Sequence, residues 1–72
     1  MKINIKITYS NDEVEIIKDV IHYETKSITI DGSTFKYHYI TTDNHIYLVK
    51  YNSVKQMEVK IGGSKYVTVI TA

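Results

Sequence analysis

Nearly half of the chain consists of four residue types that favour the pleated, half-buried surface of a β-sheet. The 72 residues include twelve isoleucines, eight threonines, seven valines and seven tyrosines. Leucine and alanine, which are strong helix formers, occur once each, at Leu48 and Ala72. The composition therefore predicts a β protein, and the length predicts one domain over residues 1–72.

The N-terminal segment has the clearest strand periodicity. Apolar and polar side chains alternate from Ile3 to Tyr9, which is the period of a strand with one buried face. The Asn-Asp pair at residues 11–12 suits a two-residue hairpin turn, because these residue types tolerate positive φ. We therefore expect an antiparallel hairpin in which Ile7 faces Ile16.

The segment after this turn has an alternative as a helix over residues 11–23. Ser10 and Glu13 have the spacing of a capping box. Apolar residues also recur at helical spacing, at Val14, Ile17 and Ile21. The β-branched side chains of this segment lose χ1 freedom in a helix, so we expect a strand and keep an α+β fold as the alternative.

A second hairpin is predicted around residues 31–32. Asp-Gly is a strong signal for a two-residue turn, and pairing across it places Ile28 opposite Phe35. Both side chains then lie on one face, which we interpret as core.

A third hairpin is predicted to turn at residues 42–44 and to return through residues 45–51. The register that aligns its aromatic residues places Tyr39 opposite Tyr47. The remaining chain predicts a 3-10 turn near residues 53–56, a strand over 57–61, a break at Gly62-Gly63 and a final strand over 66–72.

Six or seven short strands, with turns about every 8 to 12 residues, are typical of a small antiparallel barrel or sandwich. The late strand–short turn–strand layout resembles that of SH3-like and Sm-like small barrels. This resemblance concerns layout alone, and folds of this kind serve many unrelated functions.

No constellation of residues predicts catalysis, a metal site or a cofactor. The chain has no cysteine, and zinc sites need three or four converging ligands. The histidines are His22, His38 and His45, of which the last two point to opposite faces in the expected register. The sequence IGGSK lacks the spacing of a phosphate-binding loop, so we interpret it as a turn. We expect a protein that is not an enzyme.

The charge balance gives little attraction to nucleic acid. Nine lysines oppose eight acidic residues, for a net charge of +1, and arginine is absent. Binders of single strands combine aromatic platforms with basic side chains, and this remains the alternative function, through a Tyr/Lys face. Its platform would be Tyr37, Tyr39, Tyr47 and Tyr51.

The final strand carries no charge, proline or glycine, which are the residues that usually protect an edge strand. We expect it to be either a central strand or an edge that pairs with another chain. In the second case the interface would be Tyr66, Val67, Thr68, Val69 and Ile70.

These patterns favour a small, non-enzymatic protein-interaction module that acts by surface masking or by β-strand addition. We expect it to self-associate and to bind a protein whose identity the sequence does not give. Its size and near neutrality are typical of accessory or inhibitory proteins of phages and mobile elements. Because no apolar leader and no apolar run of about 20 residues is seen, we expect a cytoplasmic location and no membrane partner.

Overall fold

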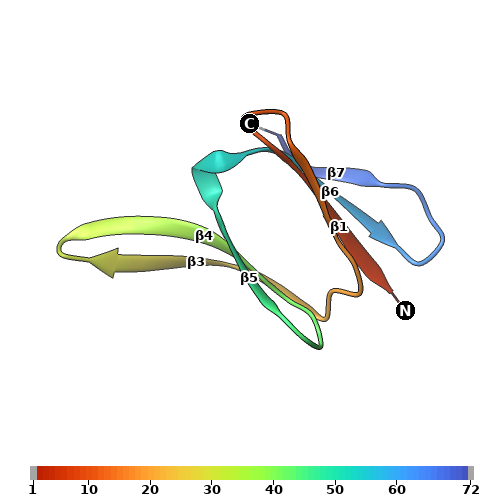
Figure 1. The fold of residues 1–72 in the computed structure, drawn as a ribbon, viewed down its shortest axis with the longest axis horizontal. Helices are drawn as coiled ribbons and strands as arrows, with labels where there is room; N and C mark the ends of the chain where they lie inside the picture. Colours follow the sequence, from red (N-terminus) through yellow and green to blue (C-terminus); the bar gives the residue numbers. More distant parts are fainter. Residues whose placement is uncertain (1, 72) are drawn as a thin grey trace.

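The computed structural model describes residues 2–71, which fold into two antiparallel sheets (Figure 1). The first sheet has the strand order β2-β1-β6-β7, and the second has the order β3-β4-β5. The strands are β1 (Ile3–Tyr9), β2 (Val14–Ile17), β3 (His22–Ile30), β4 (Ser33–Thr41), β5 (Ile46–Lys50), β6 (Val54–Ile61) and β7 (Val67–Thr71), with a short 3-10 helix, η1 (Tyr51–Ser53), after β5. In residues 2–71 no strand pairing joins the two sheets into a closed barrel. The prediction of an all-β domain of six or seven short strands is confirmed.

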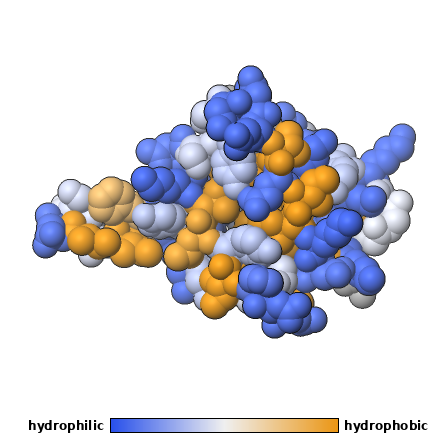
Figure 2. Space-filling model, in the orientation of Figure 1, coloured by the Kyte–Doolittle hydropathy of each residue, from blue (hydrophilic) through white to orange (hydrophobic). Residues whose placement is uncertain are grey.

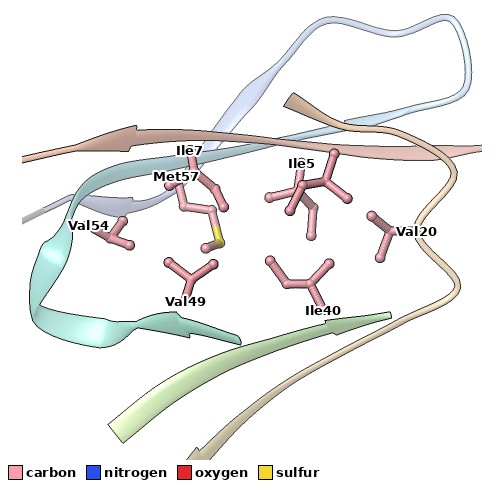
Figure 3. Packing of buried hydrophobic residues seen from close by; sticks show 8 residues of the cluster. Ile5, Ile7, Val20, Ile40, Val49, Val54 and Met57 are labelled. Carbon is pink, nitrogen blue, oxygen red and sulfur yellow. The ribbon is translucent and has the colours of Figure 1, made fainter. Parts of the chain in front are cut away.

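The core lies between the two sheets. Ile5, Ile7 and Met57 of the first sheet face Ile40 and Val49 of the second (Figure 3). The buried cluster is completed by Ile17, Val20 and Val54. Each such side chain adds about 1.5–3 kcal/mol of stability relative to an exposed position, and a chain without disulfides depends on this cluster.

Residues 11–23 form a turn, β2 and the beginning of β3, so the helix alternative for this segment is wrong. The backbone of β2 pairs with β1, and the Val20 N–H then donates to the Ile3 carbonyl oxygen at 2.8 Å. Strand pairing with a neighbour outweighs the capping signal here, because the β-branched side chains favour extended backbone.

The first hairpin forms, but its predicted register is wrong by one residue. The Tyr9 N–H donates to the Glu13 carbonyl oxygen at 2.8 Å, and Asp12 has a φ of 68°. These are the features of a three-residue loop with a left-handed residue, rather than of a two-residue turn. The longer loop places Ile7 opposite Glu15 and turns Ile17 into the core, while Ile16 is exposed.

The third hairpin differs from its prediction in the same way. Its connection has four residues, because the Thr42 N–H donates to the His45 carbonyl oxygen at 2.9 Å. The Thr42 hydroxyl also accepts the His45 N–H at 3.2 Å. Tyr39 therefore pairs with Leu48, and Tyr47 lies on the opposite face of the sheet.

The second hairpin has its predicted turn and register. Asp31 and Gly32 have φ values of 50° and 79°, as a two-residue turn with two left-handed positions requires, and Ile28 pairs with Phe35. The interpretation of this pair as core is wrong, because 37% of Ile28 and 41% of Phe35 are exposed.

The exposure follows from the register, because Ile28 and Phe35 lie on the face opposite to the buried His38 and Ile40, and from the length of this hairpin. β5 pairs with β4 only between Tyr37 and Thr41, so residues 27–36 form a two-stranded ribbon, which we call the arm. The arm extends away from the first sheet (Figure 1), and the molecule measures 43 × 26 × 17 Å. The side chains of Ile28 and Phe35 therefore point away from the core.

The C-terminal part agrees with its prediction except at the boundaries. The 3-10 turn lies at residues 51–53 instead of 53–56, because the Ser53 hydroxyl donates to the Lys50 carbonyl oxygen at 2.8 Å and β6 begins directly afterwards. Residues 62–66 connect β6 to β7, so the turn interpretation of IGGSK is confirmed. Ala72, at the end of the predicted final strand, lies outside the described residues. Within residues 2–71 no helix has the length and apolarity needed to cross a membrane.

Candidate functional site

The outer faces of the two sheets differ in polarity. In the first sheet, β1 and β6 direct mostly polar side chains away from the core, namely Asn4, Lys6, Thr8, Gln56, Glu58 and Lys60. In the second sheet thirteen side chains point outward, and six of them are polar: His22, Glu24, Lys26, Ser33, Thr41 and Lys50. The other seven are apolar or aromatic: Ile28, Ile30, Phe35, Tyr37, Tyr39, Ile46 and Leu48. We call this second set the apolar face. An antiparallel sheet normally covers one face with core and presents a polar face to water, so the second sheet departs from the rule.

The side chains of the apolar face are accessible. Ile30 is 56% exposed, Ile46 60% and Leu48 55%, whereas Tyr37 and Tyr39 are half-buried. Hydrophobic residues are visible along the arm in Figure 2. The face therefore continues from the tip of the arm, across the middle of β4, to the far end of β5.

The arm has one polar and one apolar side. Its polar side is on the side of the core and its apolar side points away from it, which is the reverse of the usual arrangement. Its inner side, on the side of the core, carries Ser27, Thr29, Thr34 and Lys36. The Thr29 and Thr34 hydroxyls lie 3.1 Å apart in a hydrogen bond. The apolar side chains of the arm point away from the core, so packing within this chain does not account for them.

Charges on the apolar face are few and mutually compensated. Lys26 Nζ lies 3.1 Å from Glu24 Oε1 and 4.3 Å from the centroid of the Tyr39 ring. The hydrogen bond from Lys26 holds the pKa of the Glu24 carboxyl below its ordinary value, and His22 lies 3.6 Å from the other carboxylate oxygen. Lys50 adds one positive charge beside Tyr37.

The base of the arm is fixed by a buried histidine between two tyrosines. The ring of His38 stacks on Tyr23 and Tyr51, with centroid distances of 5.9 and 4.9 Å. Tyr23 Oη lies 2.9 Å from His38 Nδ1, whereas His38 Nε2 has no hydrogen-bond partner among residues 2–71. Burial, together with the nearby charge of Lys36, lowers the pKa of His38.

The four tyrosines of the predicted platform do not share one surface. Tyr37 and Tyr39 belong to the apolar face, whereas Tyr47 packs against the core from the other side of the sheet. Tyr51, in η1, stacks on His38, and Lys36 Nζ lies 4.4 Å from its ring centroid. The shift of one residue in the third hairpin separates the set.

The predicted edge residues lie at one end of the first sheet. In residues 2–71, β7 pairs with β6 alone, and Val67 and Val69 are exposed. Val69 is an extra residue in this pairing, since Met57 pairs with Ile70 and Glu58 with Thr68. Such a bulge bends an edge strand and disturbs its hydrogen-bonding pattern. Tyr66 lies before β7, with Lys6 and Lys60 Nζ at 5.6 and 5.5 Å from its ring centroid.

The histidines lie apart from one another. His22 is paired with Glu24, His38 is buried, and His45 lies in the β4–β5 turn beside Tyr47. Within residues 2–71 no group of three possible metal ligands comes together.

Sequence reasoning missed most of the apolar face. Ile28 and Phe35 were expected in the core, and Ile30, Ile46 and Leu48 had no role assigned to them. The available signal was the alternation along residues 35–40, which places Phe35, Tyr37 and Tyr39 on the face opposite to Ile40.

Comparisons of the chain with protein-family models, with curated proteins and with solved structures find no match. The case for a function therefore depends on the apolar face itself.

Proposed function

We propose that this chain is a non-enzymatic protein-interaction module that binds its partner through the apolar face. One observation carries the proposal: seven apolar or aromatic side chains line the side of the second sheet that faces away from the core. Contiguous exposed apolar surface on a small domain marks an interaction site more often than chance exposure does.

The chemistry of the face favours a protein partner. Aromatic residues are enriched at the centres of protein interfaces and charged residues are depleted there, and Tyr37 and Tyr39 lie at the centre of this face. Ile28, Phe35 and Leu48 supply apolar area whose removal from water favours association, against the loss of translational and side-chain freedom that binding costs. Binding of this kind masks a surface of the partner and needs no chemical step.

Two features favour this mode over strand addition at β7. The bulge at Val69 interrupts the regular spacing of backbone groups that an added strand requires. The apolar face also covers three strands, whereas the edge offers one strand of five residues. A cytoplasmic location and a role as an accessory protein of a phage or mobile element stay predictions.

The proposal is tested by affinity capture from the native host with two variants. Phe35→Thr combined with Leu48→Thr removes apolar area from the face and keeps residues of high strand propensity. Val67→Thr is the matched control, because Val67 is an exposed apolar residue of the other sheet.

We expect the double variant to lose the captured partner and Val67→Thr to keep it. Retention of the same partner by the double variant, with both proteins folded, would contradict the proposal. Loss caused by Val67→Thr alone would move the binding surface to the β7 edge.

A further inference from the structure

The polar residues within the apolar face are arranged so that the face can pair with itself. Along the register of the second sheet, one row across the strands is Lys26–Tyr37–Lys50 and the next is Glu24–Tyr39–Leu48. The two rows carry opposite charges on β3 and a tyrosine each on β4, while on β5 they carry Lys50 and Leu48, which the exchange places opposite each other. A two-fold axis that crosses the strands between these rows exchanges one row with the other.

We propose that the apolar face is a homodimer interface, in which a second copy of this chain packs its own apolar face across such an axis. This inference rests on the proposed function and names the partner. Lys26 then lies opposite Glu24 of the second copy, and the reverse pair forms on the other side of the axis. Tyr37 lies opposite Tyr39 of the second copy in both halves, as the two-fold symmetry of an isologous interface requires.

Charge balance favours a second copy over an unrelated protein. Glu24 and Lys26 are already paired within one chain at 3.1 Å, so Lys50 alone gives the face a net charge of one sign, which is little to attract an oppositely charged partner. These two residues lie two positions apart on one strand. Rotation about the two-fold axis places Lys26 of each copy opposite Glu24 of the other. The same axis places the next row of the arm, Ile28 and Phe35, opposite His22 and Thr41 of the second copy, so two side chains that are 37% and 41% exposed in one chain become covered.

The size of the face sets the strength of the dimer. β3 and β4 have nine residues each and β5 has five, so the three strands cover roughly 360 Å² on each copy. Two copies bury on the order of 700 Å² in total, which is below the roughly 1,200 Å² at which specific, stable interfaces begin. We therefore expect a weak dimer whose fraction depends on protein concentration, with the sheets packed about 10 Å apart.

A charge-exchange experiment tests this geometry. E24K gives a chain with lysine at both positions, and K26E gives a chain with glutamate at both. Light scattering and sedimentation equilibrium over a wide concentration range then measure the dimer dissociation constant. The wild-type chain is expected to dimerise, and each variant alone to dimerise about tenfold more weakly or worse, because two attractive pairs become repulsive.

An equimolar mixture of E24K and K26E is expected to form a heterodimer at least as tight as the wild-type homodimer. The matched controls are E58K and K60E, which change the same charges two positions apart on the polar outer face of the first sheet. These controls should leave the dissociation constant within about twofold of the wild-type value. Circular dichroism of every variant verifies that the fold is kept.

A chain that stays monomeric at every concentration overturns the inference, and so does a dimer that E24K and K26E leave unchanged. Either result leaves the proposed function open to its own test. If Phe35→Thr with Leu48→Thr still abolishes capture of a foreign protein, the apolar face is a binding surface for another chain and the homodimer alone is wrong.

Discussion

At the scale of single residues, His38 is the group through which pH acts on stability. It is buried between Tyr23 and Tyr51, and the charge of Lys36 lies near it. Burial holds its pKa below the value of about 6.5 that an unfolded chain has. Between these two values the unfolded chain binds a proton and the folded chain does not, so stability falls as the pH falls below about 6.5.

Urea unfolding at several pH values between 5 and 8 measures this effect. We expect the free energy of unfolding to decrease by at most about 1.4 kcal/mol per pH unit in the acidic part of the range. His38→Phe keeps an aromatic ring in the stack and should flatten the dependence. A variant that retains the full slope would assign the effect to other groups.

Tyr9 makes the second specific contact at this scale. Its hydroxyl donates to Glu15 Oε1 at 2.6 Å, and burial with this hydrogen bond raises the pKa of Tyr9 to about 12. We expect a phenolate absorbance step near pH 12 that Tyr9→Phe removes. The same substitution should lower the free energy of unfolding at pH 7 by about 1 kcal/mol, because a hydrogen bond to a carboxylate is lost. An unchanged absorbance titration would contradict the assignment.

At the scale of elements, the sequence predicts strands well and registers less well. Asp31 and Gly32 form a two-residue turn with positive φ at both positions, and its hairpin has the predicted pairing. The loops at residues 10–12 and 42–45 are each one residue longer than predicted, since hydrogen bonds to Glu13 and His45 close them. A change of one residue in register moves every side chain to the other face.

This sensitivity explains which parts of the site escaped prediction. Residue types decide that Tyr37, Tyr39, Tyr47 and Tyr51 lie in or next to strands, but loop length decides which of them share a face. The apolar face depends further on how far β3 and β4 extend beyond β5, and that length is a property of tertiary packing. The amino-acid composition alone does not determine this length.

The arm is the element whose local stability should be lowest. Residues 27–36 form a two-stranded ribbon, and isolated ribbons are marginally stable in water. In dilute solution we expect backbone amides of the arm to exchange with deuterium faster than those of β1 and β6. Nuclear magnetic resonance at low and high protein concentration measures this, and a dimer through the apolar face should slow exchange in the arm at high concentration. Arm amides that exchange as slowly as those of β1 in dilute solution would show that the arm needs no cover.

At the scale of the whole molecule, the lysines do not form one basic surface. Lys55 is paired with Asp12 at 2.7 Å and Lys26 with Glu24, while Lys36 lies against Tyr51 on the inner side of the sheet. We expect no binding to a random single-stranded oligonucleotide at physiological salt, measured by fluorescence anisotropy. Tight binding that weakens steeply as salt increases would restore the nucleic-acid alternative, because such a slope reports contacts between lysines and phosphates.

The separation of core and apolar face permits a last prediction, that the face can be made polar without loss of the fold. Ile28, Phe35 and Leu48 lie outside the buried cluster, so replacing all three with threonine should change the free energy of unfolding by less than about 1 kcal/mol in dilute solution. Ile7→Ala, in contrast, removes a fully buried side chain and should cost about 2–5 kcal/mol.

The comparison must be made by urea unfolding at a concentration where the chain is monomeric, because a dimer adds apparent stability by mass action. At higher concentration the wild-type chain should gain stability and the triple threonine variant should not. If the triple variant unfolds in dilute solution, the apolar face contributes to the monomer and is not reserved for a partner. A folded triple variant without the concentration-dependent gain would locate the association on this face, independently of the charge exchange.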